Sequence, residues 1–124
     1  MATQFDAEAR EAFAQQEEVR VRTGEHRFIP IWTVVVNGRV FARSWQQRED
    51  GWAAALARSE PGEVKVNGEP RPVEALVVGT EDRALTNAID QAYRDKYDDA
   101  WHEYVVRLTD DDAQATTLEL LEVG

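Results

Sequence analysis

Hydrophobic and polar residues alternate along several short stretches of this chain, a two-residue period that is typical of half-buried β-strands. These stretches are VRVR at 19–22, RVFARS at 39–44 and EVKV at 63–66. The intervening IPIWTVVV at 29–36 is apolar on both faces and predicts a central strand. Asn37-Gly38 and Asn67-Gly68 favour two-residue hairpin turns. The pattern predicts barrel strands within about 19–78 and a closing strand within about 115–123.

Helical periodicity appears before, between and after these strands. Asp6 can cap a helix of about 7–18, Asp50 can cap a short helix that carries Trp52, and a helical insertion is expected at about 81–108. The predicted order α-β-β-β-α-β-β-α-β contains about six strands, most of them in hairpins. We therefore expect a single α+β domain spanning 1–124, mainly β, built as an antiparallel barrel with flanking helices.

The charge of the chain limits its partners. The net charge of −10 argues against nucleic acid or an anionic membrane. No apolar run is long enough to span a membrane, and the polar N-terminus does not resemble a secretory signal, so we expect a cytoplasmic protein. Residues 20–48 nevertheless hold six arginines and one acid, Glu25. This segment predicts either a site for a small anion or arginines that pair with acids elsewhere in the fold.

Familiar catalytic motifs are missing from the sequence. It contains no cysteine, no glycine-rich dinucleotide or phosphate loop, no G-x-S-x-G and no H-E-x-x-H. The two histidines, His26 and His102, are far apart, and neither has a second ligand at helical spacing. We therefore expect no metal site.

One group of residues suits a charged, flat ligand. Arg22, Arg27 and Ser44 lie near the ends of predicted strands, where guanidinium groups, a hydroxyl and loop amides can hold a phosphate or carboxylate. Trp32 and Trp45 can line an aromatic ring. Each has a structural alternative: surface or ion-pair roles for the arginines, a backbone hydrogen bond for Ser44, and an interface for Trp45. Trp52 is expected to be a core anchor, and alternation directs Arg43 to the face opposite Ser44.

Two stretches extend this interpretation by resemblance. RTGEHRFIPIW, followed by VNGRVFARSWQQREDGWAAALARSEPGEVKVNGE, resembles the split-barrel deazaflavin-dependent nitroreductases. The matching positions are Arg22, Thr23, Gly24, Arg27, Pro30 and Ser44. The C-terminal half, with NAIDQAYRDKYDD, EYVV and TLELLEV, most resembles an uncharacterised bacterial family, domain of unknown function 2255. That resemblance covers nearly the whole chain, and the family is similar to the flavin-binding split barrels as a distant relative.

The resemblance implies an FMN-binding split-barrel-like fold and a flavin- or deazaflavin-dependent oxidoreductase, such as a nitroreductase. By this resemblance Arg22, Arg27 and Ser44 would hold the phosphate tail of the cofactor, deazaflavin or FMN. Trp45 and Trp32 are the residues expected, from their aromatic rings, to line its ring system. Tyr97 and His26 are the candidate proton donors for a reduced small-molecule substrate. The resembled group also implies a homodimer.

Two alternatives to an enzyme remain open. The relatives often place a basic residue where this chain has Trp45, and an asparagine where it has Ala55, which favours a non-enzymatic small-ligand-binding barrel. A structural or dimerising domain without cofactor is the other alternative, with tryptophans as interface anchors.

Overall fold

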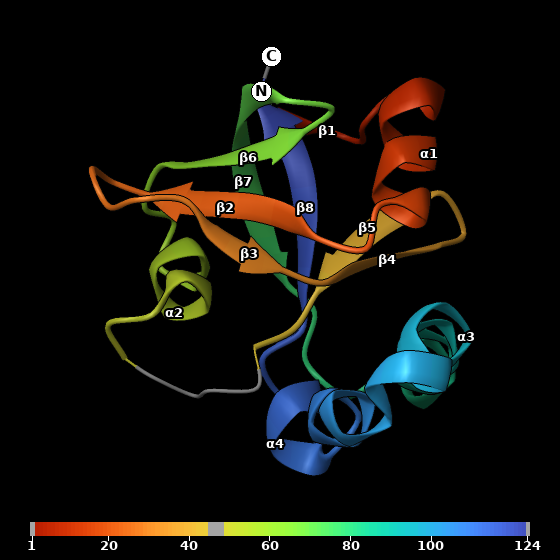
Figure 1. Ribbon diagram of the computed structural model, residues 1–124. Helices are drawn as coiled ribbons and strands as arrows, with labels where there is room; N and C mark the ends of the chain where they lie inside the picture. Colours follow the sequence, from red (N-terminus) through yellow and green to blue (C-terminus); the bar gives the residue numbers. More distant parts are fainter. Residues whose placement is uncertain (1, 45–48, 124) are drawn as a thin grey trace.

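The computed structural model describes residues 2–44 and 49–123, apart from the side chains of 98–100. Trp45, one of the predicted ring-binding residues, lies outside the described residues. The described chain forms four helices and eight strands (Figure 1). In chain order these are β1 (Ala2–Thr3), α1 (Ala7–Gln15), β2 (Val19–Thr23), β3 (Ile29–Ile31), β4 (Thr33–Val36), β5 (Arg39–Ala42), α2 (Trp52–Ala57), β6 (Gly62–Val66), β7 (Glu69–Val77), α3 (Arg83–Leu108), α4 (Asp111–Gln114) and β8 (Leu118–Val123).

The strands form one antiparallel sheet that curls into a nearly closed barrel. Its strand order is β3-β2-β6-β7-β8-β5-β4, with β1 paired to the end of β8. The two edge strands, β3 and β4, are consecutive in sequence and separated only by Trp32. The chain therefore passes directly from one edge of the sheet to the other and brings the edges together. The predicted mainly-β antiparallel barrel with flanking helices is confirmed.

The predicted strand count of about six is too low for two reasons. The apolar run at 29–36 was expected to be one strand, but it divides at Trp32 into β3, which pairs with β2, and β4, which pairs with β5. The two residues of β1 add a further short strand against β8. Periodicity does not reveal such a division, because both halves of the run are apolar.

The turns follow their local sequence. Asn37 and Gly38 have φ values of 53° and 76°, and Asn67 and Gly68 have 59° and 87°, which are the positive values that a two-residue hairpin requires. Pro70 and Pro72 lie in the first half of β7 and pair only with β6, because β8 joins β7 from Val73 onward. Neither proline therefore interrupts a central ladder.

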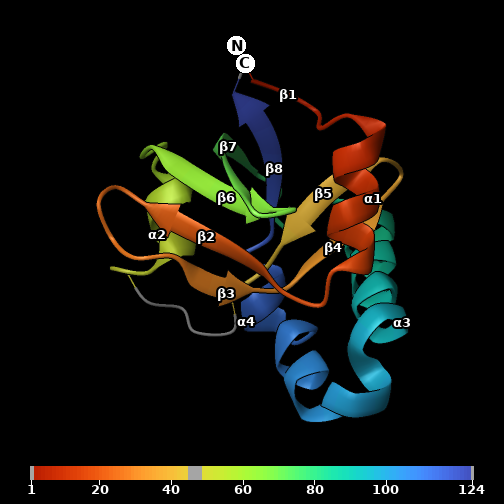
Figure 2. The same cartoon turned by 45° about the horizontal axis from the view of Figure 1, so that its top comes forward.

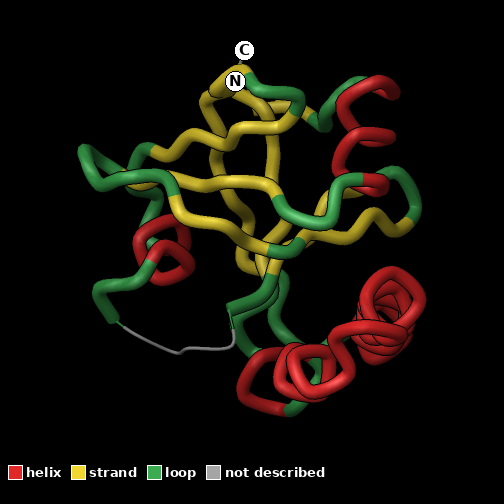
Figure 3. Tube along the Cα trace, in the orientation of Figure 1, coloured by secondary structure: helices red, strands yellow, loops and turns green. Residues whose placement is uncertain are grey.

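The main core fills the barrel. Val21, Val64 and Leu120 are among its buried side chains, and α1 contributes Ala9 and Phe13. The side chain of Asp6 accepts a hydrogen bond from the Ala9 amide at 2.8 Å and caps α1, which ends at Gln15 rather than near 18. Figures 2 and 3 show the helices around the outside of the strands.

A second core lies between α3 and the outer face of β4 and β5. Val34 and Phe41 from the sheet pack there with Ile89, Tyr93 and Val105 of α3. The backbone of α3 departs from helical geometry at Trp101, where φ is −130° and ψ is 33°, and this kink redirects its last two turns. The acidic run at 110–113 begins the short helix α4, with Asp110 as its cap.

Arg43 connects the barrel to α3 and to the segment before β8. Its side chain is fully buried and forms an ion pair with Asp90. It also donates to the Thr117 hydroxyl at 2.9 Å and to the Leu108 carbonyl oxygen at 2.9 Å, while Gln114 donates to the second oxygen of Asp90. Arg43 thus points to the face opposite the barrel interior, as strand alternation predicted, and is held in a structural network.

Candidate functional site

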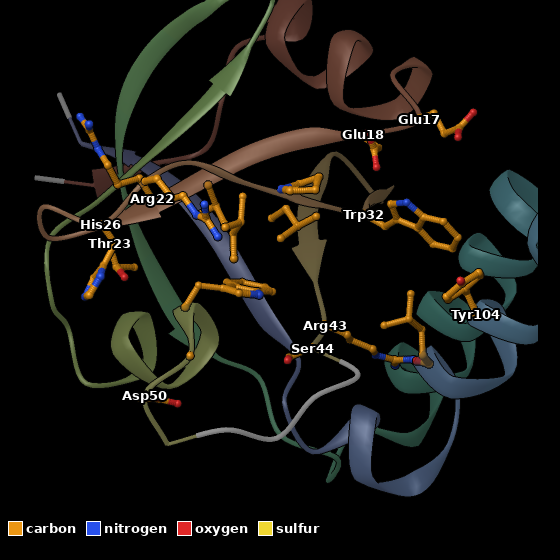
Figure 4. Close-up of a pocket in the computed structure, with 18 of the residues that line it drawn as sticks. Glu17, Glu18, Arg22, Thr23, His26, Trp32, Arg43, Ser44, Asp50 and Tyr104 are labelled. Atoms are coloured by element: carbon orange, nitrogen blue, oxygen red, sulfur yellow. The ribbon is translucent and has the colours of Figure 1, made fainter.

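A pocket of about 620 Å³ opens between the β2–β3 side of the barrel, α2 and α3. Its size falls within the range of about 300–1,000 Å³ that is typical of small-molecule sites. Figure 4 shows side chains from all three parts of the fold around it. The pocket forms here because the barrel seam at Trp32 leaves β3 as an edge strand, which neither β4 nor a helix covers completely.

One end of the pocket is basic. Arg22, at the end of β2, lies beside Thr23 and His26 in Figure 4, and Arg27 also lines the cavity. Arg22 forms an ion pair with Glu63 of the neighbouring strand, and its guanidinium carbon is 4.4 Å from the centre of the Phe28 ring. Arg27 is exposed and makes no side-chain hydrogen bond or ion pair within the described residues. Its positive charge is therefore available to a ligand, whereas that of Arg22 is partly neutralised.

Ser44 lies on a separate wall, where β5 ends. Its residue is buried and lines the pocket. The Thr116 hydroxyl accepts from the Ser44 amide at 2.9 Å and lies 3.2 Å from the Ser44 carbonyl oxygen, while it donates its proton to the Ala113 carbonyl oxygen at 2.7 Å. This double contact fixes the position at which the chain leaves the barrel.

Aromatic side chains cover much of the remaining wall. Trp52, at the start of α2, is half-buried, packs against the main core and also lines the cavity. Trp32 and Tyr104 of α3 lie at the end opposite Arg22 in Figure 4. Trp101 of α3 also lines the cavity, and its ring centroid is 6.0 Å from that of Trp32. The kink at Trp101 directs the last turns of α3 so that Trp101 and Tyr104 meet Trp32 while Val105 stays in the second core.

Tyr97 supports this wall from behind and does not line the pocket. Its ring stacks on Trp32. Its hydroxyl donates to the carbonyl oxygen of Glu17 at 2.7 Å and also lies 3.3 Å from the carbonyl oxygen of Thr33. Burial raises the pKa of Tyr97 well above its ordinary value, and the nearby hydroxyl of Tyr93 and the carboxylates of Glu17 and Glu18 add to this. Its proton is thus committed to the backbone, which argues against the predicted role as proton donor.

Lys96 is a second buried polar group behind the same wall. Its ammonium donates to the carbonyl oxygens of Phe13 and Thr33, each at 2.7 Å. Burial lowers the pKa of Lys96 from 10.5 to about 8. The contact with Phe13 satisfies a carbonyl oxygen in the last turn of α1, so Lys96 joins that helix end to the barrel.

The rim above the aromatic end is acidic. Glu17 and Glu18, between α1 and β2, line the pocket and are exposed. Figure 4 shows the carboxylate of Glu18 directed toward the cavity and Glu17 at the rim above Trp32. The pocket consequently has a basic end and an acidic, aromatic end, an arrangement that orients a charged ligand.

Comparison with known proteins identifies the family. The model of the uncharacterised protein family conserved in bacteria that is called DUF2255 matches residues 10–120. The chain belongs to this family. The predicted resemblance to domain of unknown function 2255 is therefore confirmed, and no curated protein matches the chain.

Among solved structures, the DUF2255 chain is similar to the crystal structure of the conserved hypothetical protein Rv2991 from Mycobacterium tuberculosis. The two are 14% identical, the TM-score is 0.56, and the similarity covers 99% of this chain and 82% of that chain. At this identity the likeness concerns the fold alone. No helix in the described part of the chain is long and apolar enough to cross a membrane, and the same part contains no group of three or more His, Asp or Glu side chains suited to a metal ion.

Most of the sequence-predicted site residues of this DUF2255 protein meet at one cavity. Arg22, Arg27, Ser44, Trp32 and His26 all line it. Their role in ligand binding stays a prediction, as does that of Trp45. Sequence reasoning assigned Trp52 to the core alone and did not connect Trp101, Tyr104, Glu17 or Glu18 with the site. No sequence signal separates Trp101 and Tyr104 from the buried Val105 and Leu108, because all four share the i, i+3, i+4, i+7 spacing of one helical face.

Proposed function

We propose that the pocket binds a flavin or deazaflavin and that the protein acts as an oxidoreductase. The observation that supports this is that one cavity is lined both by aromatic side chains and by Arg27. Arg27 has no ionic partner among the described residues. The resemblance of the stretch from Arg22 to Ser44 to the split-barrel nitroreductases points to the same class of ligand.

The residues of the pocket fit such a group in size and chemistry. Arg27 can pair with a phosphate or carboxylate tail, and Arg22 can share its guanidinium between Glu63 and the ligand. The buried Ser44 offers a polar contact on another wall. Trp52 and Trp32 offer the apolar surfaces that a tricyclic ring needs.

The charges of the chain would set the direction of binding. Glu17 and Glu18 repel an anionic tail from the aromatic end, so the tail would lie toward Arg27 and the ring toward the tryptophans. Val21, Ile29 and Ile31 add apolar side chains to the lining of the cavity. The bound cofactor would supply the hydride chemistry, and His26, which lines the pocket, is the candidate proton donor.

Titration of the purified protein with FMN, and separately with a deazaflavin, tests this function. We expect quenching of cofactor fluorescence with a dissociation constant no weaker than tens of micromolar, on the order of −6 to −7 kcal/mol. Arg27→Gln should weaken binding, whereas Arg20→Gln, an exposed arginine on the same strand as Arg22 that does not line the pocket, should leave it unchanged. Absence of binding by both cofactors in this range would overturn the proposal.

A second candidate is a non-enzymatic ligand-binding barrel. The observation that favours it is the position of Tyr97, one of the two predicted proton donors, which does not line the pocket and donates its hydroxyl proton to the Glu17 carbonyl oxygen. Reductase assays with the cofactor-loaded protein separate the two candidates. Stoichiometric binding without turnover of nitroaromatic or quinone substrates would favour the carrier.

A further inference from the structure

The acidic, aromatic end of the pocket has the composition of a site for an organic cation. Trp32, Trp101 and Tyr104 form a compact triangle of rings. The centroid of Trp32 is 6.0 Å from that of Trp101 and 5.9 Å from that of Tyr104, and Trp101 and Tyr104 are 6.1 Å apart. All three pairs meet edge to face, at interplanar angles of 61–70°. All three rings line the cavity, and an aromatic face attracts a cation through its negative partial charge.

These rings are unusually exposed for their size. Trp101 retains 38% and Tyr104 43% of its accessible surface, and both line the cavity. Their exposure follows from the kink at Trp101, which directs them toward Trp32. A contiguous set of exposed aromatic rings around a cavity is typical of a ligand-binding surface.

The carboxylates of Glu17 and Glu18 give this end a negative potential. Neither forms an ion pair with any residue in 2–44 or 49–123. The negative charges of both carboxylates help to raise the pKa of Tyr97. Because the ring of Tyr97 stacks on Trp32, these charges lie close to the aromatic wall. The ring faces carry negative partial charge as well, and the two sources add.

The cations near this end are already engaged. Arg43 lines the pocket but forms its ion pair with Asp90, and Lys96 directs its ammonium to the carbonyl oxygens of Phe13 and Thr33. Neither donates to Glu17 or Glu18 in the described structure. The acidic end can therefore accept a further positive charge from a ligand.

The walls select the kind of cation. A bare metal ion needs several oxygen or nitrogen ligands, which the described residues do not group together. A primary ammonium needs hydrogen-bond acceptors on three sides, whereas the rings of Trp32, Trp101 and Tyr104 offer apolar faces. A substituted ammonium, with carbon groups around the charge, matches aromatic faces beside carboxylates.

We propose that this end of the pocket binds a substituted-ammonium group of a small-molecule ligand. The proposal deepens and rests on the proposed function, since it names the chemistry of the second ligand that would share the cavity with the anionic cofactor. Opposite charges at the two ends would then place cofactor and substrate in a defined order along the pocket.

Ligand-observed NMR with two matched probes tests the charge requirement. Choline and 3,3-dimethylbutan-1-ol have the same shape and each gives a nine-proton singlet, but only choline is charged. We expect saturation transfer from the protein to choline and at least about ten-fold weaker binding of the alcohol. Equal binding of the two probes, or no binding of choline at concentrations of tens of millimolar, on the order of the weakest measurable affinities, would overturn the proposal.

Variants locate the binding to this end. Glu17→Gln combined with Glu18→Gln, and separately Trp101→Leu, should weaken choline binding by about ten-fold, while Trp101→Phe should retain most of it. Arg27→Gln, at the basic end, should leave it unchanged or strengthen it. Choline binding that is indifferent to the Glu17 and Glu18 substitutions would contradict the assignment.

The proposed cofactor binding and the proposed cation site can be overturned by different results. FMN titration of the Glu17→Gln, Glu18→Gln protein should show binding at least as tight as that of the unsubstituted protein, because a repulsive charge is removed. Choline binding without binding of either cofactor would overturn the proposed function and leave the cation site standing. Cofactor binding without choline binding would overturn the cation site and leave the proposed function standing.

Discussion

The ring of Tyr97 lies parallel to the indole of Trp32, with 4.1 Å between ring centroids and 4° between planes. Trp32 occupies the junction of β3 and β4, so the stack holds the barrel seam and the pocket wall against α3. The hydroxyl of Tyr97 adds two backbone contacts on the side away from the cavity. Tyr97 therefore positions Trp32.

This relationship predicts different results for two substitutions. Tyr97→Phe keeps the stack and loses the hydroxyl contacts, so the free energy of unfolding should fall by about 1 kcal/mol and ligand binding should persist. Tyr97→Leu also removes the stack, and both stability and ligand affinity should fall further. Urea denaturation followed by tryptophan fluorescence measures the first quantity. A loss of turnover in a folded Tyr97→Phe protein that still binds cofactor would restore the proton-donor role.

The buried ion pair of Arg43 and Asp90 should dominate the attachment of α3. Arg43→Ala leaves the carboxylate of Asp90 buried without its cation, which should cost about 3–5 kcal/mol of stability. Arg58→Ala removes an exposed partner of Glu60 and should cost no more than about 1 kcal/mol, which makes it the matched control. If urea denaturation shows equal losses of unfolding free energy for Arg43→Ala and Arg58→Ala, the hydrogen-bond network of Arg43 contributes little to stability.

Lys96 should make stability rise with pH above neutrality. Its pKa is lowered from 10.5 to about 8 in the folded state, so between these values the unfolded chain binds more protons than the folded chain. The contribution is fully present above about 10.5 and is lost as pH falls through about 8. Deprotonation preserves both contacts, because a neutral amine retains two N–H donors for the carbonyl oxygens of Phe13 and Thr33.

Chemical denaturation at pH 7.5 and pH 9.5 measures this effect, with Lys96→Met as the reference. The unsubstituted protein should gain stability between the two pH values relative to Lys96→Met. Above pH 10 the buried Tyr93 and Tyr97, whose pKa values are raised, act in the opposite direction because the unfolded chain ionises first. A difference between the two proteins that does not change with pH would contradict the assignment.

Arg27 and Arg22 should contribute unequally to the binding of an anionic ligand. Arg27 has no ionic partner among the described residues, whereas Arg22 already pairs with Glu63. Arg27→Gln should weaken FMN binding by about ten-fold, the value of a charge-assisted hydrogen bond, and Arg22→Gln by less. Affinity should also fall with added salt, less steeply in the Arg27→Gln protein. A larger effect of Arg22→Gln would place the anion nearer to β6.

Local sequence was informative wherever a short-range rule sets the structure. The two Asn-Gly hairpins and the cap at Asp6 depend on neighbouring residues. The same rules missed the division of 29–36 and the helical turn of α4, because apolar content and acidic composition are each compatible with more than one local structure.

The sequence by itself determined the class of the fold, since alternation and turn chemistry specify hairpins. It also singled out the candidate site residues Arg22, Arg27, Ser44, Trp45, Trp32, Tyr97 and His26. Only the tertiary structure decided which of them share a cavity and which charges are engaged. Arg22 meets Glu63 across 41 residues and Arg43 meets Asp90 across 47. Such contacts depend on how far the sheet curls and where α3 bends, and both are set by packing of the whole chain.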